Sequence, residues 1–143
     1  MRPSLAVLAA ALALPLPLLA GPLTDRVGTV QDIPVEEWIA MARGRTLTYR
    51  IDDRFWAMER YDPGSNRVRL QLTDGTCMEG TWDYSPPHYC FHWNGIGTAC
   101  FRHVRQGDEI LIIETRDGVD TPMVQTMTGV SDIPLACGPA VTS

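Results

Sequence analysis

The residues best suited to chemistry lie close together, between Cys77 and Val104, where the chain carries three of its four cysteines and all three histidines. Imidazole and thiolate groups are common metal ligands. His88 and His92 would share one face of a strand but lie ~13 Å apart at ~3.3 Å per residue, whereas a Zn–N bond is only ~2.0–2.1 Å long. His103 falls on the other face. The spacing argues against a metal site, and we expect no metal and no cofactor.

Other catalytic arrangements are also poorly represented. The chain has no Gly-x-Ser-x-Gly nucleophile motif, no Cys-x-x-Cys unit and no glycine-rich phosphate loop. Many of its aspartates stand in segments typical of turns. Methionines are soft copper ligands in principle, but scattered methionines more often fill cores. We therefore assign no catalytic residue, and keep a metal-binding protein or a small enzyme as alternatives.

The N-terminal residues predict export. Arg2 precedes an apolar run from Leu5 to Ala20. Such a run is typical of a signal peptide, and it is shorter than the ~20 apolar residues that cross a bilayer. We expect residues 1–20 to be removed, leaving residues 21–143 as a single domain. That domain is expected to be periplasmic or secreted and to have no transmembrane segment.

Charge narrows the range of partners. After residue 20 the chain has 17 acidic side chains against 11 arginines, a difference of −6 in formal charge, and it has no lysine. Binding to nucleic acid depends largely on neutralising phosphates with clustered basic residues. An acidic domain with no basic run is not expected to bind nucleic acid. Its partner is expected to be a periplasmic protein or a small ligand.

Four cysteines behind a signal peptide are typical of two disulfides. Two cysteines can bridge neighbouring strands directly only when they share a face. A three-residue loop from Asn94 to Ile96 would place Cys90 opposite Cys100, whereas a two-residue turn would put them on opposite faces. We therefore predict a Cys90–Cys100 bridge, which leaves Cys77–Cys137 to hold the C-terminal tail.

The same register predicts two faces for this hairpin. One face is aromatic and is expected to lie in the core: Tyr89, Phe91, Trp93, Ala99 and Phe101. The other is polar and carries both cysteines: His88, Cys90, His92, Thr98, Cys100 and Arg102. From the polar face we take His88, His92 and Arg102, with the loop residue Asn94, as candidate residues for binding a ligand or a partner.

The rest of the chain indicates a scaffold of short strands. Apolar residues at helical spacing between Asp32 and Gly44 predict one short amphipathic helix. Alternating apolar residues predict strands at 46–51, 55–61, 67–72, 77–83, 88–93, 98–104, 108–114 and 122–127. The tail from Thr128 is expected to be a loop. This pattern is typical of a mainly β domain, a small antiparallel barrel or curved sheet with one short N-terminal helix.

Two of these strands carry residues with a particular meaning. Gly80 lies inside a predicted strand, which indicates a bulge or the close approach of a neighbouring group. The strand at 67–72 places Arg67, Arg69 and Gln71 on one side. Such a row is more typical of a solvent-facing surface than of an anion site.

Several short motifs resemble a group of small exported alphaproteobacterial proteins of unknown function. They are D-x-x-C-x-x-G-x-W from Asp74, Y-C-F-x-W from Tyr89, C-F at Cys100, L-x-C-G-P from Leu135 and G-R-T-L-T-Y from Gly44. The resemblance covers most of the chain after residue 20. It implies an exported domain with a framework of four cysteines and a Gly-x-Trp motif, and it implies no particular activity.

Taken together, the sequence indicates a binding or interaction module that is exported to the periplasm and has no catalytic activity. An inhibitor of a periplasmic or cell-wall hydrolase is one alternative. Its contacts would be made by exposed loops such as 85–87 or 94–97.

Overall fold

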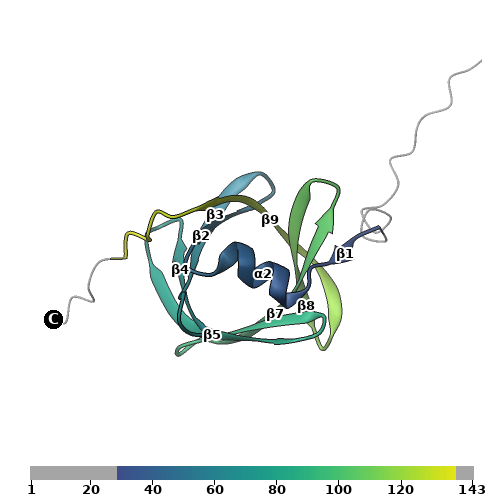
Figure 1. The fold of residues 1–143 in the computed structure, drawn as a ribbon, viewed down its shortest axis with the longest axis horizontal. Coiled ribbons are helices and arrows are strands. Elements are labelled where there is room, and N and C mark those ends of the chain that lie inside the picture. Colours follow the sequence, from purple (N-terminus) through teal and green to yellow (C-terminus); the bar gives the residue numbers. More distant parts are fainter. Residues whose placement is uncertain (1–28, 138–143) are drawn as a thin grey trace, which may run out of the picture.

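Eight antiparallel strands form a closed barrel, which confirms the predicted fold class. The computed structural model describes residues 29–137, so the predicted signal peptide at 1–20 lies outside the described residues. The strands follow one another in chain order: β2 (Thr46–Ile51), β3 (Arg54–Tyr61), β4 (Arg67–Leu72), β5 (Cys77–Ser85), β6 (His88–Trp93), β7 (Gly97–Gln106), β8 (Glu109–Arg116) and β9 (Val119–Ser131). Pairing of β9 with β2 closes the ring seen end-on in Figure 1.

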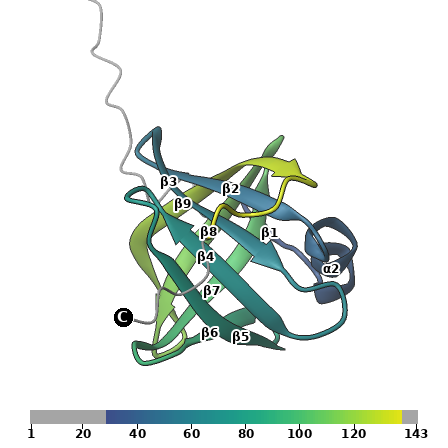
Figure 2. The ribbon, with the colours of Figure 1, turned by 90° about the vertical axis from the view of Figure 1, so that its left-hand side faces the viewer.

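The helix found within residues 29–137, α2 (Val35–Ala42), lies across one end of the barrel (Figures 1 and 2). Pro34 precedes it in an extended conformation, and two glutamates occupy its first turn, where the helix dipole favours negative charge. Trp38 and Ala42, four residues apart on one face, are fully buried. Within residues 29–137 no helix is long and apolar enough to cross a bilayer.

A short strand before the helix fixes its position. This strand, β1 (Gln31–Asp32), pairs with β7 beyond the end of β6. Next to it, the backbone N–H of Ile33 donates to the carbonyl of His103 at 2.8 Å, and the hydroxyl of Tyr89 donates to the carbonyl of Ile33 at 2.9 Å. The helix is therefore tied to the barrel by backbone hydrogen bonds as well as by its apolar face.

Aromatic side chains fill the barrel interior beneath the helix. The ring of Trp38 lies 4.0 Å from that of His103 and 5.9 Å from that of Tyr89, measured between centroids. Tyr89 in turn stacks on His103 at 3.9 Å. Tyr61 and Trp82 extend the cluster, with centroids 5.8 Å apart. Smaller apolar residues complete the core: Leu47, Val68, Ile110 and Ile112.

The central hairpin has the register that the sequence predicts. Trp93 pairs with Gly97 across a three-residue loop, and Cys90 pairs with Cys100. Both predicted disulfides are present, Cys90–Cys100 and Cys77–Cys137. The aromatic face of the hairpin points into the core, as Phe91 and Tyr89 are buried.

The expectation of a loop from Thr128 onward is wrong for residues 128–131, which belong to β9. They pair with the first half of β2, for example Thr48 with Gly129 and Leu47 with Val130. The segment shows no apolar alternation, but its pairing satisfies backbone groups of β2 that would otherwise be left open at the seam of the barrel. The chain from there to Cys137 crosses the outside of β4, where the Gln71 side chain donates to the carbonyl of Ala136 at 3.3 Å.

Candidate functional site

The four candidate binding residues all lie on the outside of the barrel, but they do not form one site. Asn94 lines a hollow of about 460 Å³ on the outer face of β3 to β6. His88 lines a second hollow, of about 660 Å³, bordered by β6, β7 and β8. His92 and Arg102 line neither of these hollows and are bonded to other side chains.

Arg102 joins three strands of the barrel wall. Its Nε and Nη2 donate to the two carboxylate oxygens of Asp32 on β1, at 2.9 and 3.1 Å. Its Nη1 donates to Asp120 on β9 at 2.6 Å. Hydrogen bonding to Asp32 raises the pKa of the Arg102 guanidinium, and Asp120 adds to this effect. With both carboxylates occupied and 20% of its side chain exposed, Arg102 has a structural role.

We expect Arg102→Gln to lower the free energy of unfolding by about 1–2 kcal/mol, because charge-assisted hydrogen bonds to partly buried carboxylates are lost. Arg67→Gln is the matched control: Arg67 also pairs with an aspartate, but 75% of its side chain is exposed. The control should change stability by less than about 0.5 kcal/mol. Urea denaturation of both variants measures the difference, and equal stabilities would contradict the structural role of Arg102.

His92 lies in a chain of three hydrogen-bonded side chains across β5, β6 and β7. Its Nε2 is 2.5 Å from Oδ2 of Asp83, and its Nδ1 is 2.8 Å from Oγ1 of Thr98. This is the order of groups found in acyl-transfer triads. However, 43% of the His92 side chain and 61% of the Asp83 side chain are exposed. Asp83 was not identified from the sequence, although strand alternation places it on the face opposite the buried Trp82.

The second hollow exposes the hairpin disulfide to solvent. Ser85, His88, Cys90 and Cys100 border it on one side, and the turn between β8 and β9 borders it on the other. Within the described chain, Nε2 of His88 is buried and has no hydrogen-bond partner. At the end of β8, which also borders this hollow, Glu114 and Arg116 pair with each other at 3.4 Å.

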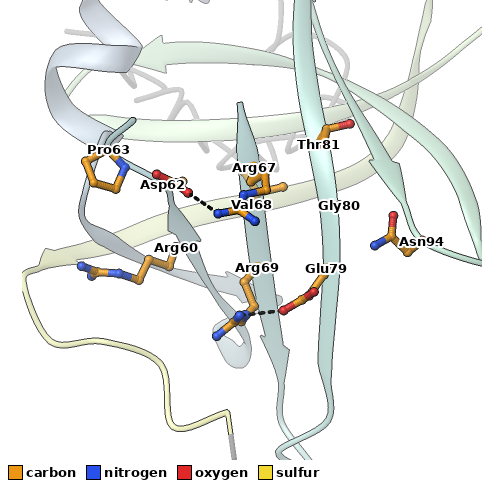
Figure 3. A pocket seen from close by; sticks show the side chains of 10 residues that line it. All are labelled: Arg60, Asp62, Pro63, Arg67, Val68, Arg69, Glu79, Gly80, Thr81 and Asn94. Atoms are coloured by element: carbon orange, nitrogen blue, oxygen red, sulfur yellow. Dashed lines mark hydrogen bonds and ion pairs between the residues drawn. The ribbon is translucent and has the colours of Figure 1, made fainter. Parts of the chain in front are cut away.

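The first hollow is lined by three arginines, which we call the arginine face: Arg60, Arg67 and Arg69. Arg67 pairs with Asp62 and Arg69 with Glu79, as the dashed lines in Figure 3 show. Thr81 and Asn94 stand on the side away from the arginines. The strand alternation predicted for residues 67–72 is confirmed at Arg67, Val68 and Arg69. The expectation that Gln71 faces solvent is wrong, because the segment that ends at Cys137 crosses over it and buries it.

The barrel interior holds a carboxyl group that the sequence did not indicate. Glu59 on β3 faces inward between the buried Ala57 and Tyr61, and it is 5% exposed. The hydroxyl of Tyr49 donates to its Oε2 at 2.9 Å. Burial raises the pKa of Glu59 to about 7, although the hydroxyls of Tyr49 and Tyr61 favour its ionised form. The alternation of Ala57, Glu59 and Tyr61 was the available signal.

His103 is the second titratable group inside the barrel. It is 1% exposed, lies between the rings of Trp38 and Tyr89, and its Nδ1 has no hydrogen-bond partner within residues 29–137. Burial holds its pKa well below the usual value, so the imidazole is neutral. In the described part of the chain, no group of three or more histidine, cysteine, aspartate or glutamate side chains could hold a metal ion.

Comparison with known proteins does not assign this chain to a family. No protein-family model, no curated protein and no solved structure matches the chain. Its function must therefore be argued from the barrel and its surfaces.

Proposed function

We propose that this protein is an exported binding module that acts through its outer surface and has no catalytic activity. The observation that carries the proposal is the filled interior of the barrel. Small barrels that bind a ligand internally keep a cavity open at one end. Here α2 covers one end, and the space beneath it is packed with the rings of Trp38, Tyr61, Tyr89 and His103.

Export is supported by two independent features. The apolar run from Leu5 to Ala20 has the pattern of a signal peptide. The two disulfides are compatible with an oxidising compartment, where such bridges persist. We place the mature protein in the periplasm, in agreement with the resemblance to small exported alphaproteobacterial proteins.

The absence of catalysis is inferred from the environment of the triad-like arrangement of Asp83, His92 and Thr98. Asp83, His92 and Thr98 lie on an open outer face of the barrel. Catalytic groups gain most of their effect where water is excluded and charge is stabilised by fixed dipoles. Solvent competes for both ring nitrogens of a half-exposed histidine, so this chain of hydrogen bonds is better explained as a cross-strand surface contact.

Inhibition of a hydrolase is a second candidate, favoured by the loop between β6 and β7. Ile96 at its tip is 66% exposed, and the Cys90–Cys100 bridge holds the two strands that carry it. A rigid loop with an exposed apolar residue is well suited to inhibit an enzyme, because the loop loses little conformational entropy when it binds.

The experiment that tests the binding proposal uses the oxidised mature protein, immobilised and incubated with envelope extract of the producing cells. Saturable retention of a component, reversed by excess free protein, is the expected result. Retention that cannot be saturated or displaced would overturn the proposal. Ile96→Asp separates the two candidates: it should abolish inhibition of a hydrolase if the loop is the contact, and leave retention unchanged if another surface is used.

A further inference from the structure

The arginine face stands out because the protein as a whole is acidic. The chain has a formal net charge of −5, yet Arg60, Arg67 and Arg69 lie together on the outer surface of β3 and β4. They border a hollow of about 460 Å³. Two carboxylates share this hollow, Asp62 and Glu79, so arginine exceeds acid there.

Of the three arginines, two form ion pairs with carboxylates of the described chain and the third, Arg60, does not. Arg60 and Arg69 are directly opposite in the pairing of β3 with β4, an arrangement in which like charges repel. Glu79 neutralises Arg69, at 2.6 Å. Arg60 makes its hydrogen bond to the hydroxyl of Thr46, at 3.3 Å, and within residues 29–137 it has no carboxylate at ion-pair distance. An anion beside Arg60 would therefore stabilise the pair.

The other side of the hollow offers neutral polar groups. Thr81 pairs with Arg67 across β4 and β5, and Asn94 begins the loop after β6. Neither side chain is hydrogen-bonded to another residue of the described chain. Figure 3 shows Thr81 on β5 and Asn94 beyond it, on the other side of β5 from the strands that carry the arginines. A ligand in the hollow would meet guanidinium donors on one side and a hydroxyl and an amide on the other.

We propose that the arginine face binds an extended, acidic segment of a partner protein. Arg67 and Arg69 alternate along one strand, so their side chains project ~6.6 Å apart. Alternate residues of an extended peptide have the same spacing, so two carboxylates at positions i and i+2 would match the two arginines. They would share these arginines with Asp62 and Glu79, whose ion pairs are exposed and contribute little. Arg60 and Asn94 lie on either side of the row formed by Arg67 and Arg69. Arg60 would bind a further carboxylate of the peptide, and the Asn94 amide would donate to one of its backbone carbonyls.

This inference rests on the proposed binding function and names the surface and the chemistry of the partner. The test uses the full oxidised protein, ¹⁵N-labelled, titrated with a capped octapeptide of alternating glutamate and threonine at low ionic strength. We expect saturable shifts of the amides of Arg69, Glu79, Thr81 and Asn94. The Arg60→Gln/Arg69→Gln variant should bind about fivefold more weakly, the loss expected for two exposed charge pairs.

Arg54→Gln is the matched control, since Arg54 is exposed on the same strand as Arg60 and outside the hollow. Its affinity should stay within about twofold of that of the parent protein. Equal losses in both variants would show attraction by net charge and overturn the site. Shifts produced by phosphatidylglycerol vesicles and not by the peptide would overturn the protein partner in favour of a lipid. Envelope retention that survives Arg60→Gln/Arg69→Gln would overturn this inference and leave the binding function intact.

Discussion

Replacing Gly80 by alanine is expected to destabilise the protein by about 3 kcal/mol. A Cβ atom at this position would lie 2.4 Å from the carbonyl oxygen of His92 and 3.1 Å from its carbonyl carbon. Both atoms belong to the backbone of β6, which is fixed by pairing on both sides in a closed barrel. The ring of Trp93, 3.0 Å away, blocks movement toward the interior. The clash can be relieved only by shifting a strand.

Gly129→Ala is the control for this prediction. Gly129 is also in a barrel strand, but the nearest atoms to a Cβ there are 3.8 Å away, on the side chain of Thr48. Its variant should differ from the parent by less than about 0.5 kcal/mol, in either direction. Thermal unfolding followed by circular dichroism should show a midpoint about 10 °C or more lower for Gly80→Ala. Equal midpoints for the two variants would show that β5 and β6 approach less closely than described.

The two buried titratable groups are expected to give pH dependences of opposite sign, which oppose each other in the parent protein. The pKa of Glu59 is 4.5 when unfolded and about 7 when folded, so its contribution to stability is full below pH 4.5 and is lost as pH rises toward 7. The pKa of His103 is lowered from 6.5, so its contribution is full above pH 6.5 and is lost as pH falls. Each slope is about 1.4 kcal/mol per pH unit, that of Glu59 between about pH 4.5 and 7 and that of His103 in the range just below pH 6.5.

Replacing one of the two groups should reveal how the other changes the free energy of unfolding with pH. In Glu59→Gln the free energy of unfolding should rise with pH in the range just below pH 6.5, because the slope from His103 remains. In His103→Phe, which keeps a ring against Tyr89, it should fall with pH, by about 3 kcal/mol in total between pH 4.5 and 7. Tyr49 and Tyr61 do not titrate in this range, since burial raises the pKa of both well above 10.

The double variant Glu59→Gln/His103→Phe gives the background slope of all other groups. Urea denaturation at half-unit pH steps measures all four proteins. Relative to the double variant, Glu59→Gln should have a more positive slope and His103→Phe a more negative one. A Glu59→Gln protein with the parent's slope would mean that Glu59 is hydrated in the folded state.

The sequence predicted the barrel and the Cys90–Cys100 disulfide because these depend on local patterns, and it predicted Cys77–Cys137, which spans 60 positions, as the remaining pair. Alternation defined the strands, and a three-residue loop at Asn94 set the register that brings Cys90 opposite Cys100. The helix followed from spacing and from Pro34 and Gly44 at its ends. Each of these signals is contained within a few neighbouring residues, so a single chain is enough to detect it.

The candidate site was predicted less well, because its chemistry depends on distant residues. The sequence predicts Arg102 as a binding residue, because its structural partner Asp32 is 70 positions away and no local pattern links the two. The sequence does not place Glu59 inside the barrel, because carboxylates that face a core are uncommon. Its hydrogen-bond partner Tyr49 lies on another strand, so alternation along β3 does not reveal it. The sequence indicates only a solvent-facing row of Arg67, Arg69 and Gln71, because Arg60 lies on a different strand.

The central claim is that the barrel interior is filled and that recognition takes place on the outer surface. A native mass spectrum of the protein purified from its own envelope, compared with its denatured spectrum, tests this most directly. The account predicts the mass of the chain with two disulfides and no retained small molecule. A molecule held one to one, released only on denaturation and lost in a variant of the interior such as Trp38→Phe, would contradict it.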